Sequence, residues 1–193
     1  MHDVSAPLPR TDQPVSPKRS ARGIIGRLLL AAAIVAALAA WGRAVGADDP
    51  LFAATAGFTL LGLLELVGYF VRLPAPLGKP RAWEGSSRLY RRLGVTAFGA
   101  LLRGSPLRHL NLRVYRRAAG GLRELMEAME EAEASHTIAF AIVGLYSATA
   151  ALRGWWPAFA ALCALNLVAN LYPILHLRHC RARLAALTAR RPR

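Results

Sequence analysis

Acidic residues and cysteines are both scarce in this sequence. Only 11 Asp and Glu stand against 25 Lys and Arg in 193 residues, which gives a formal net charge of +14. The two cysteines, Cys163 and Cys180, are too few for a disulfide framework, so a small cystine-rich secreted domain is excluded. A chain of this length also leaves little room for a second domain. The remaining classes are a basic membrane protein and a basic nucleic-acid binder.

Hydrophobic residues make up 54% of the chain and gather in four blocks. The blocks cover residues 23–41, 51–71, 137–152 and 155–177. A helix needs about 20 apolar residues to cross a hydrocarbon core of about 30 Å. The blocks therefore predict an all-α, polytopic membrane protein with about four transmembrane helices. Glu65 is the only charge in the second block, and it either pairs with Arg72 or lines a polar cavity.

The segments outside these blocks differ in character. Residues 1–22 are rich in proline and predict a disordered tail ahead of a membrane domain at 23–184. Residues 72–136 mix aromatic, leucine and arginine residues, which is typical of an interfacial or cytoplasmic segment. From Leu122 a helical pattern continues into the third block without a turn residue, which predicts one long helix. Residues 185–193 form a basic tail.

The basic residues indicate the orientation of the spans. If the N-terminus is cytoplasmic, the two exterior loops, 42–50 and 153–154, contain only Arg43 and Arg153 as basic residues. This asymmetry follows the positive-inside rule, so both termini are predicted in the cytoplasm. The large net charge then reflects topology and contact with the lipid bilayer, and no nucleic-acid partner is expected. A competing interpretation takes residues 1–47 as a cleaved signal peptide.

Polar side chains within or beside the apolar blocks are candidates for function, because each costs free energy in hydrocarbon unless it has a partner. The set is Glu133, His136, Asn166, Asn170, His176 and Arg178. If the last two blocks form a hairpin that pivots near Gly154, a rise of about 1.5 Å per residue puts His136 level with Asn170. The structural alternative is that the two asparagines hold helices together.

These residues carry a resemblance to a known family. Ala132-Glu133-Ala134-Ser135-His136, Asn170-Leu171-Tyr172-Pro173 and Arg178-His179-Cys180-Arg181-Ala182-Arg183-Leu184 resemble motifs of the glycosyl-4,4'-diaponeurosporenoate acyltransferases, which are bacterial membrane proteins. The resemblance covers about residues 83–184. The chain departs from the family pattern at Leu177, His179, Cys180 and Ala182, and it has Thr137 where the family usually has tryptophan.

The resemblance implies transfer of a fatty acyl group to a hydroxyl of a lipophilic glycoside in the bacterial inner membrane. His136 would act as the base, oriented by Glu133, with Asn170 as a donor to the oxyanion or hydroxyl. Substrate would be bound by Arg178, Arg181, Arg183 and His176, and acyl-CoA is a candidate donor. No cofactor or metal is expected. Neither G-x-S-x-G nor H-x-x-x-x-D occurs, which favours direct transfer over an acyl-enzyme.

Two other functions are compatible with the same residues. One is a non-enzymatic membrane scaffold or accessory subunit, in which the polar residues only join helices. The other is a membrane methyltransferase of the isoprenylcysteine type. The signature R-H-P-x-Y-x-G of that family is missing, since Cys180 follows Arg178-His179.

Overall fold

The computed structural model of this protein describes residues 21–67, 74, 78–85, 88–105 and 121–189. These residues contain helices and no strands, so the predicted all-α class holds for the described part of the chain. The helical elements are α1 (Ala21–Val45), α2 (Pro50–Val67), η2 (Ala82–Gly85), α4 (Arg88–Arg92), α5 (Val95–Gly104), α7 (Leu122–Leu152), α8 (Trp156–Leu165), η4 (Asn166–Leu171) and α9 (Tyr172–Ala189).

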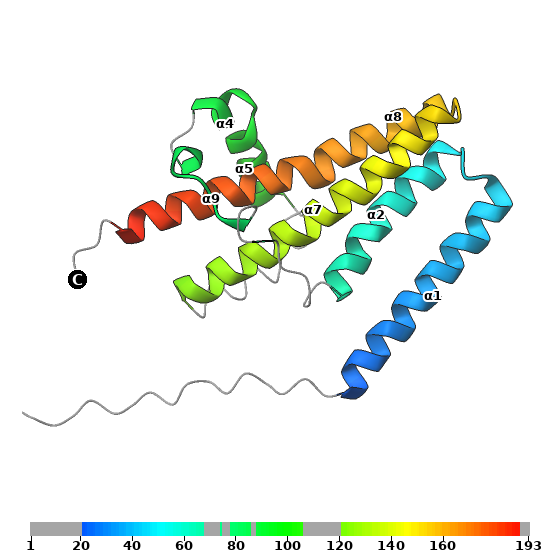
Figure 1. Ribbon diagram of the computed structural model, residues 1–193, viewed down its shortest axis with the longest axis horizontal. Coiled ribbons are helices and arrows are strands. Elements are labelled where there is room, and N and C mark those ends of the chain that lie inside the picture. The colour runs from blue at the N-terminus through cyan, green and yellow to red at the C-terminus, as the bar shows by residue number, and fades with distance from the viewer. Residues whose placement is uncertain (1–20, 68–73, 75–77, 86–87, 106–120, 190–193) are drawn as a thin grey trace, which may run out of the picture.

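The long helices form a bundle. Figure 1 shows α2, α7 and the run from α8 to α9 side by side, with α1 at the outer edge next to α2. None of the membrane-length part of α1 is buried inside the protein, whereas α7 and the α8–α9 run each bury more than a fifth of theirs. The shorter elements η2 and α5 pack on α9. The core of the described structure is therefore α7 with the helices on either side of it.

Small residues let α7 approach its neighbours closely. Most of its buried positions recur every three or four residues, which places them on one side of the helix, whereas all four residues from 132 to 135 are buried. They include Ala128, Ala132, Ser135, Ala139, Val143, Ser147 and Ala150. Opposite them, Ala158 and Leu162 of α8 complete a core cluster together with Ala53 of α2. Close helix packing through small side chains is typical of membrane bundles.

The predicted hairpin and the predicted long helix are both confirmed. α7 runs unbroken from Leu122 to Leu152, and residues 153–155 turn the chain into α8. Gly154 has a φ of 73°, a left-handed conformation that favours glycine. Beyond this turn, α7 packs in succession against α8, η4 and α9.

The helix after the hairpin changes pitch in its middle. Residues Asn166–Leu171 form a π-helix, in which the Tyr172 N–H bonds to the Leu167 carbonyl five residues back. Pro173 supplies a local reason, because proline has no N–H and its ring crowds the carbonyl four residues earlier, that of Ala169. A π turn ahead of the proline relieves this crowding. The turn also brings two asparagines of η4 into the buried interior.

The predicted span boundaries need adjustment. Three described helices are long and apolar enough to cross a membrane: Gly23–Val45, Leu122–Leu152 and Trp156–Ala189. α2 is shorter as described, and the end of the predicted span 51–71 lies outside the described residues. The fourth predicted block, 155–177, is part of a helix that continues to Ala189. The side chain of Glu65 and residue Arg72 also lie outside the described part.

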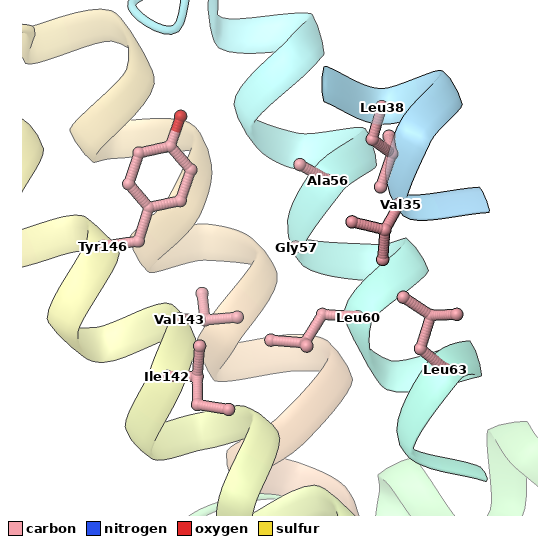
Figure 2. A pocket seen from close by; sticks show the side chains of 9 residues that line it. All are labelled: Val35, Leu38, Ala56, Gly57, Leu60, Leu63, Ile142, Val143 and Tyr146. Carbon is pink, nitrogen blue, oxygen red and sulfur yellow. The ribbon is translucent and has the colours of Figure 1, made fainter. Parts of the chain in front are cut away.

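An apolar groove lies between α1, α2 and α7. Its volume is about 240 Å³. Figure 2 shows hydrocarbon side chains around it from all three helices. Tyr146 lines one side, and its hydroxyl donates to the Ala47 carbonyl at 2.8 Å. The lining of the groove is thus almost entirely apolar.

Candidate functional site

Glu133 is the most deeply buried acid in the described structure. Its side chain on α7 is 0% exposed, and two arginines of α9 neutralise it. The Nη1 of Arg178 donates to Oε1 at 2.8 Å, and the Nη1 of Arg181 donates to Oε2 at 2.5 Å. A buried carboxylate is stable only with such compensation. These ion pairs fasten α7 to α9 one turn before His136.

Glu84 extends this cluster into the segment before α4. Glu84 is 4% exposed. Its carboxylate accepts hydrogen bonds from Arg178, from Nε at 2.9 Å and from Nη2 at 3.4 Å. The Arg81 backbone N–H also donates to it. Burial raises the pKa of Glu84, but the hydrogen bonds and charge of Arg178 and the Arg81 N–H outweigh burial and hold the pKa below its ordinary value. Glu84 therefore stays ionised beside Arg178.

Tyr90 and His179 close the same cluster. The Tyr90 hydroxyl donates to Glu84 Oε1 at 3.3 Å, and burial together with this carboxylate raises the pKa of Tyr90 to about 12. His179 Nδ1 lies 2.7 Å from the Glu84 backbone oxygen, and its ring meets that of Tyr90 at 5.3 Å. The segment from η2 to α4 is thereby docked on α9.

Arg181 has further partners of its own. Its Nη2 donates to the Gly78 carbonyl at 2.8 Å and to Glu130 at 3.3 Å. The side chain is almost fully buried. We name the set Glu84, Glu130, Glu133, Arg178 and Arg181 the ion-pair cluster.

His136 lies in a second, less charged arrangement. Its imidazole is within reach of the Asn170 side chain and the Ala169 carbonyl. His136 and Asn170 therefore lie at the same level of the hairpin, as predicted. Asn170 is 1% exposed. Its Nδ2 donates to Asn166 Oδ1 at 2.8 Å, and Asn166 donates in turn to the Phe140 carbonyl of α7 at 3.0 Å. We call His136, Asn166 and Asn170 the histidine–asparagine layer.

Two buried atoms of this layer have unused hydrogen-bonding capacity. The Nδ1 of His136 and the Oδ1 of Asn170 make no well-formed hydrogen bond within the described residues. Buried polar atoms of native proteins nearly always have partners, so such exceptions require an explanation. A third atom of this kind, the Nε of Arg181, lies in the ion-pair cluster.

The predicted site residues thus separate into two groups. The structure brings His136 and Asn170 together, and it brings Glu133 together with Arg178 and Arg181. It does not bring Glu133 to His136, since both carboxylate oxygens of Glu133 accept from arginine. The guanidinium groups of Arg178 and Arg181, which were predicted to bind substrate, already bind carboxylates of the protein itself.

The remaining predicted residues lie on the outer parts of α9. His176 packs against Gly99 and the Phe98 ring of α5, and its ring is 3.8 Å from the Cys180 sulfur. Arg183 is exposed. Within the described ranges, no group of three or more His, Cys, Asp or Glu side chains could hold a metal ion.

Glu84 is the site residue that sequence reasoning missed. It is the only charged residue of the short element Ala82–Gly85, and its neighbours do not show which cation it binds. Its partner Arg178 is 94 residues away. The available signal was an acid next to Trp83 at the start of an otherwise basic, aromatic segment.

The fold and these two arrangements define the class of the protein. It is a helical protein with membrane-length apolar helices and a polar interior built between two of them. Residues 74–190 match the family described as glycosyl-4,4'-diaponeurosporenoate acyltransferase, so the chain belongs to that family. The family name implies acyltransferase activity. No curated protein and no solved structure matches the sequence significantly.

Proposed function

We propose that this protein is a membrane acyltransferase that esterifies a hydroxyl of a lipophilic, carotenoid-like glycoside with a fatty acyl group. The observation that carries the proposal is the proximity of His136 on α7 to Asn170 on η4, within the region that matches the family. A histidine is the commonest general base, and it needs a neighbour that fixes its ring. Asn170 is the positioning residue in this proposal.

The reaction follows from these groups. His136 accepts the proton of the acceptor hydroxyl while that oxygen attacks the acyl carbonyl carbon. A C–O bond forms, and the bond from the acyl carbon to its donor breaks. With an acyl thioester such as acyl-CoA as donor, the leaving thiolate takes the proton back from His136. The ester and the free thiol are then the two products, and the histidine is neutral again.

The apolar groove supports a lipophilic substrate. Val143, which lines the groove, follows His136 by seven residues and therefore lies on nearly the same face of α7. The separation along the helix is about 10 Å at 1.5 Å per residue. A hydrocarbon chain with its reacting end at His136 reaches the groove within about this length.

The proposed setting is the bacterial inner membrane. In this proposal α1, α2, α7 and the α8–α9 run cross the bilayer, and both termini are cytoplasmic. The segment 72–136 includes α4 and α5 at the cytoplasmic interface, where Arg88, Arg91 and Arg92 are exposed beside Leu89 and Leu93. Exposed leucine next to arginine suits the headgroup region. Arg183 and the C-terminal basic residues lie on the same side.

One observation favours a second function, that of a non-enzymatic scaffold or accessory subunit. Asn166 joins α7 to η4 by its bond to the Phe140 carbonyl, and Asn170 supports Asn166. This is the geometry expected of residues that only hold helices together. A scaffold or accessory subunit would need nothing more from the histidine–asparagine layer.

Substitutions at His136 and Asn166 test the two functions against each other. We expect His136→Ala to lower the transfer rate by about 10²–10⁴-fold, the usual effect of losing a general base, while the protein stays folded. Asn166→Ala should lower thermal stability and leave the rate per folded molecule nearly unchanged. The assay is transfer of a labelled acyl group in membranes, with a deletion strain profiled for unesterified glycolipid.

If the histidine–asparagine layer only holds helices together, the opposite pattern is expected. A fully active His136→Ala variant, with Asn166→Ala and Asn170→Ala lowering only expression, would show that the base lies elsewhere. Glu133→Gln is the matched control for stability, because Glu133 belongs to the ion-pair cluster. We expect it to reduce the folded fraction more than the rate per folded molecule.

A further inference from the structure

The two orphan atoms of the histidine–asparagine layer are complementary. The Nδ1 of His136 can carry a proton and donate, whereas the Oδ1 of Asn170 can only accept. The imidazole lies within reach of this side chain. A donor and an acceptor that are both buried and lack other partners stabilise each other most when the proton is on Nδ1.

The Ala169 carbonyl adds a second acceptor on the same side. In an α-helix this carbonyl would receive the N–H of residue 173, four positions later. Residue 173 is proline and has no N–H. The Ala169 carbonyl therefore cannot receive the α-helical bond from residue 173, and the His136 imidazole lies within reach of it.

The π-helix shows that this arrangement is built into the fold. Asn166–Leu171 is the only π-helical stretch among the described residues, and it ends two residues before Pro173. π turns occur often at functional sites, because they redirect side chains and backbone groups. Here the turn carries both Asn170 and Ala169, the two residues that face the imidazole.

We propose that Pro173 is a positioning residue: because it withholds a backbone N–H, the Ala169 carbonyl stays available with Asn170 to accept from His136 Nδ1. The neutral imidazole is then held in the tautomer with its proton on Nδ1. In that tautomer the lone pair is on Nε2, which becomes the atom that accepts a proton. The link to catalysis rests on the proposed function, whereas the tautomer itself does not.

The tautomer is measurable by nuclear magnetic resonance on the full-length protein in lipid nanodiscs, with histidine rings labelled with ¹⁵N. The pH is set above the ordinary histidine pKa of about 6.5, so that the ring is neutral. A His136→Gln spectrum identifies the signals of His136. We expect the wild-type protein to show a protonated Nδ1 and an unprotonated Nε2 at this residue.

Two variants and one control test the cause. Pro173→Ala restores an N–H that competes for the Ala169 carbonyl, and Asn170→Leu removes the other acceptor. Each should shift His136 toward the tautomer with the proton on Nε2. Pro157→Ala is the matched control, because Pro157 is exposed in the first turn of α8 and should leave the His136 signals unchanged. Circular dichroism confirms that helical content is retained.

Three results would overturn the proposal or its parts. A wild-type His136 with its proton on Nε2 contradicts the tautomer assignment. A folded Pro173→Ala variant with unchanged His136 signals contradicts the role of Pro173.

If Pro173→Ala changes the tautomer, we expect kcat to fall, but by less than in His136→Ala, while KM stays nearly constant. A changed tautomer with unchanged kcat overturns the catalytic role of His136 and leaves the tautomer assignment standing.

Discussion

At the scale of single residues, Glu84 decides how the segment around η2 is attached to α9. Its carboxylate receives two hydrogen bonds from Arg178, one from the Tyr90 hydroxyl and one from a backbone N–H. Arg178 also binds Glu133, so a single guanidinium group joins an acid of α7 to an acid far from it in the sequence. Loss of Glu84 should therefore affect two packing interfaces at once.

We expect Glu84→Gln to lower the free energy of unfolding by about 1–3 kcal/mol, the cost of weakening a partly buried charged hydrogen bond. The measurements are the thermal midpoint in detergent and faster amide exchange in η2, α4 and α5. The control is Glu127→Gln, which breaks the exposed pair with Arg123 on α7. Exposed pairs of this spacing contribute only about 0.3–0.5 kcal/mol.

The destabilising effect of Glu84→Gln should depend on pH. Because the pKa of Glu84 is lower in the folded protein than its ordinary value of 4.5, its stabilising effect is fully present above pH 4.5. The effect is lost as the pH falls below 4.5 through the lower folded value. The difference in thermal midpoint between wild type and Glu84→Gln should shrink across that range. A constant difference would show that the charge of Glu84 is irrelevant.

At the scale of elements, the contact of α5 with α9 depends on one glycine. Gly99 of α5 faces the His176 ring so closely that a Cβ at this position would overlap the Cε1 and Nδ1 atoms. The neighbouring contacts fix the rest of the interface: the Phe98 and Tyr172 rings lie 5.4 Å apart, and the Tyr172 hydroxyl donates to the Leu93 carbonyl at 2.9 Å. The helix pair therefore has little freedom to shift.

Gly99→Ala should destabilise the docking of α5 by about 1–3 kcal/mol, as overpacking usually does. Gly104→Ala in the same helix is the control, since its added Cβ meets no atom within 4 Å. The double variant Gly99→Ala/His176→Ala should recover much of the loss, because the clashing ring is gone. Equal thermal midpoints for Gly99→Ala and Gly104→Ala would contradict the close contact between Gly99 and the His176 ring.

At the scale of the whole molecule, the proposed orientation of the helices in the bilayer can be tested with reporter fusions. Reporter fusions after residues 47 and 154 should report the exterior, and fusions after residues 110 and 193 the cytoplasm, because the predicted exterior loops carry only Arg43 and Arg153. Fusion pairs with opposite reporters serve as controls for expression. A cytoplasmic signal at residue 154 would rule out the proposed orientation of the α7–α8 hairpin.

The sequence predicted the parts of this molecule that depend on regular geometry. The level of His136 relative to Asn170 followed from a turn at Gly154 and a constant helical rise. The partners of Arg178 did not follow, because a count of charges along the chain says nothing about which carboxylates fold onto them. Glu84 was missed for the same reason. The π-helix was also missed, although Pro173 was visible, since helix pitch depends on how the neighbouring helix accommodates the proline.

The weak attachment of α1 has an evolutionary consequence. α1 meets the bundle mainly along α2, with a groove lined by hydrocarbon side chains on its inner side and none of its membrane-length stretch buried. If α1 crosses the bilayer as proposed, we expect selection to act on its length and hydrophobicity rather than on the shape of each side chain. Substitutions among leucine, isoleucine, valine and alanine are close to neutral there. α2 also lies before the matched region, residues 74–190, but its Ala53 is buried in the core, so we expect this tolerance in α1 and not in α2.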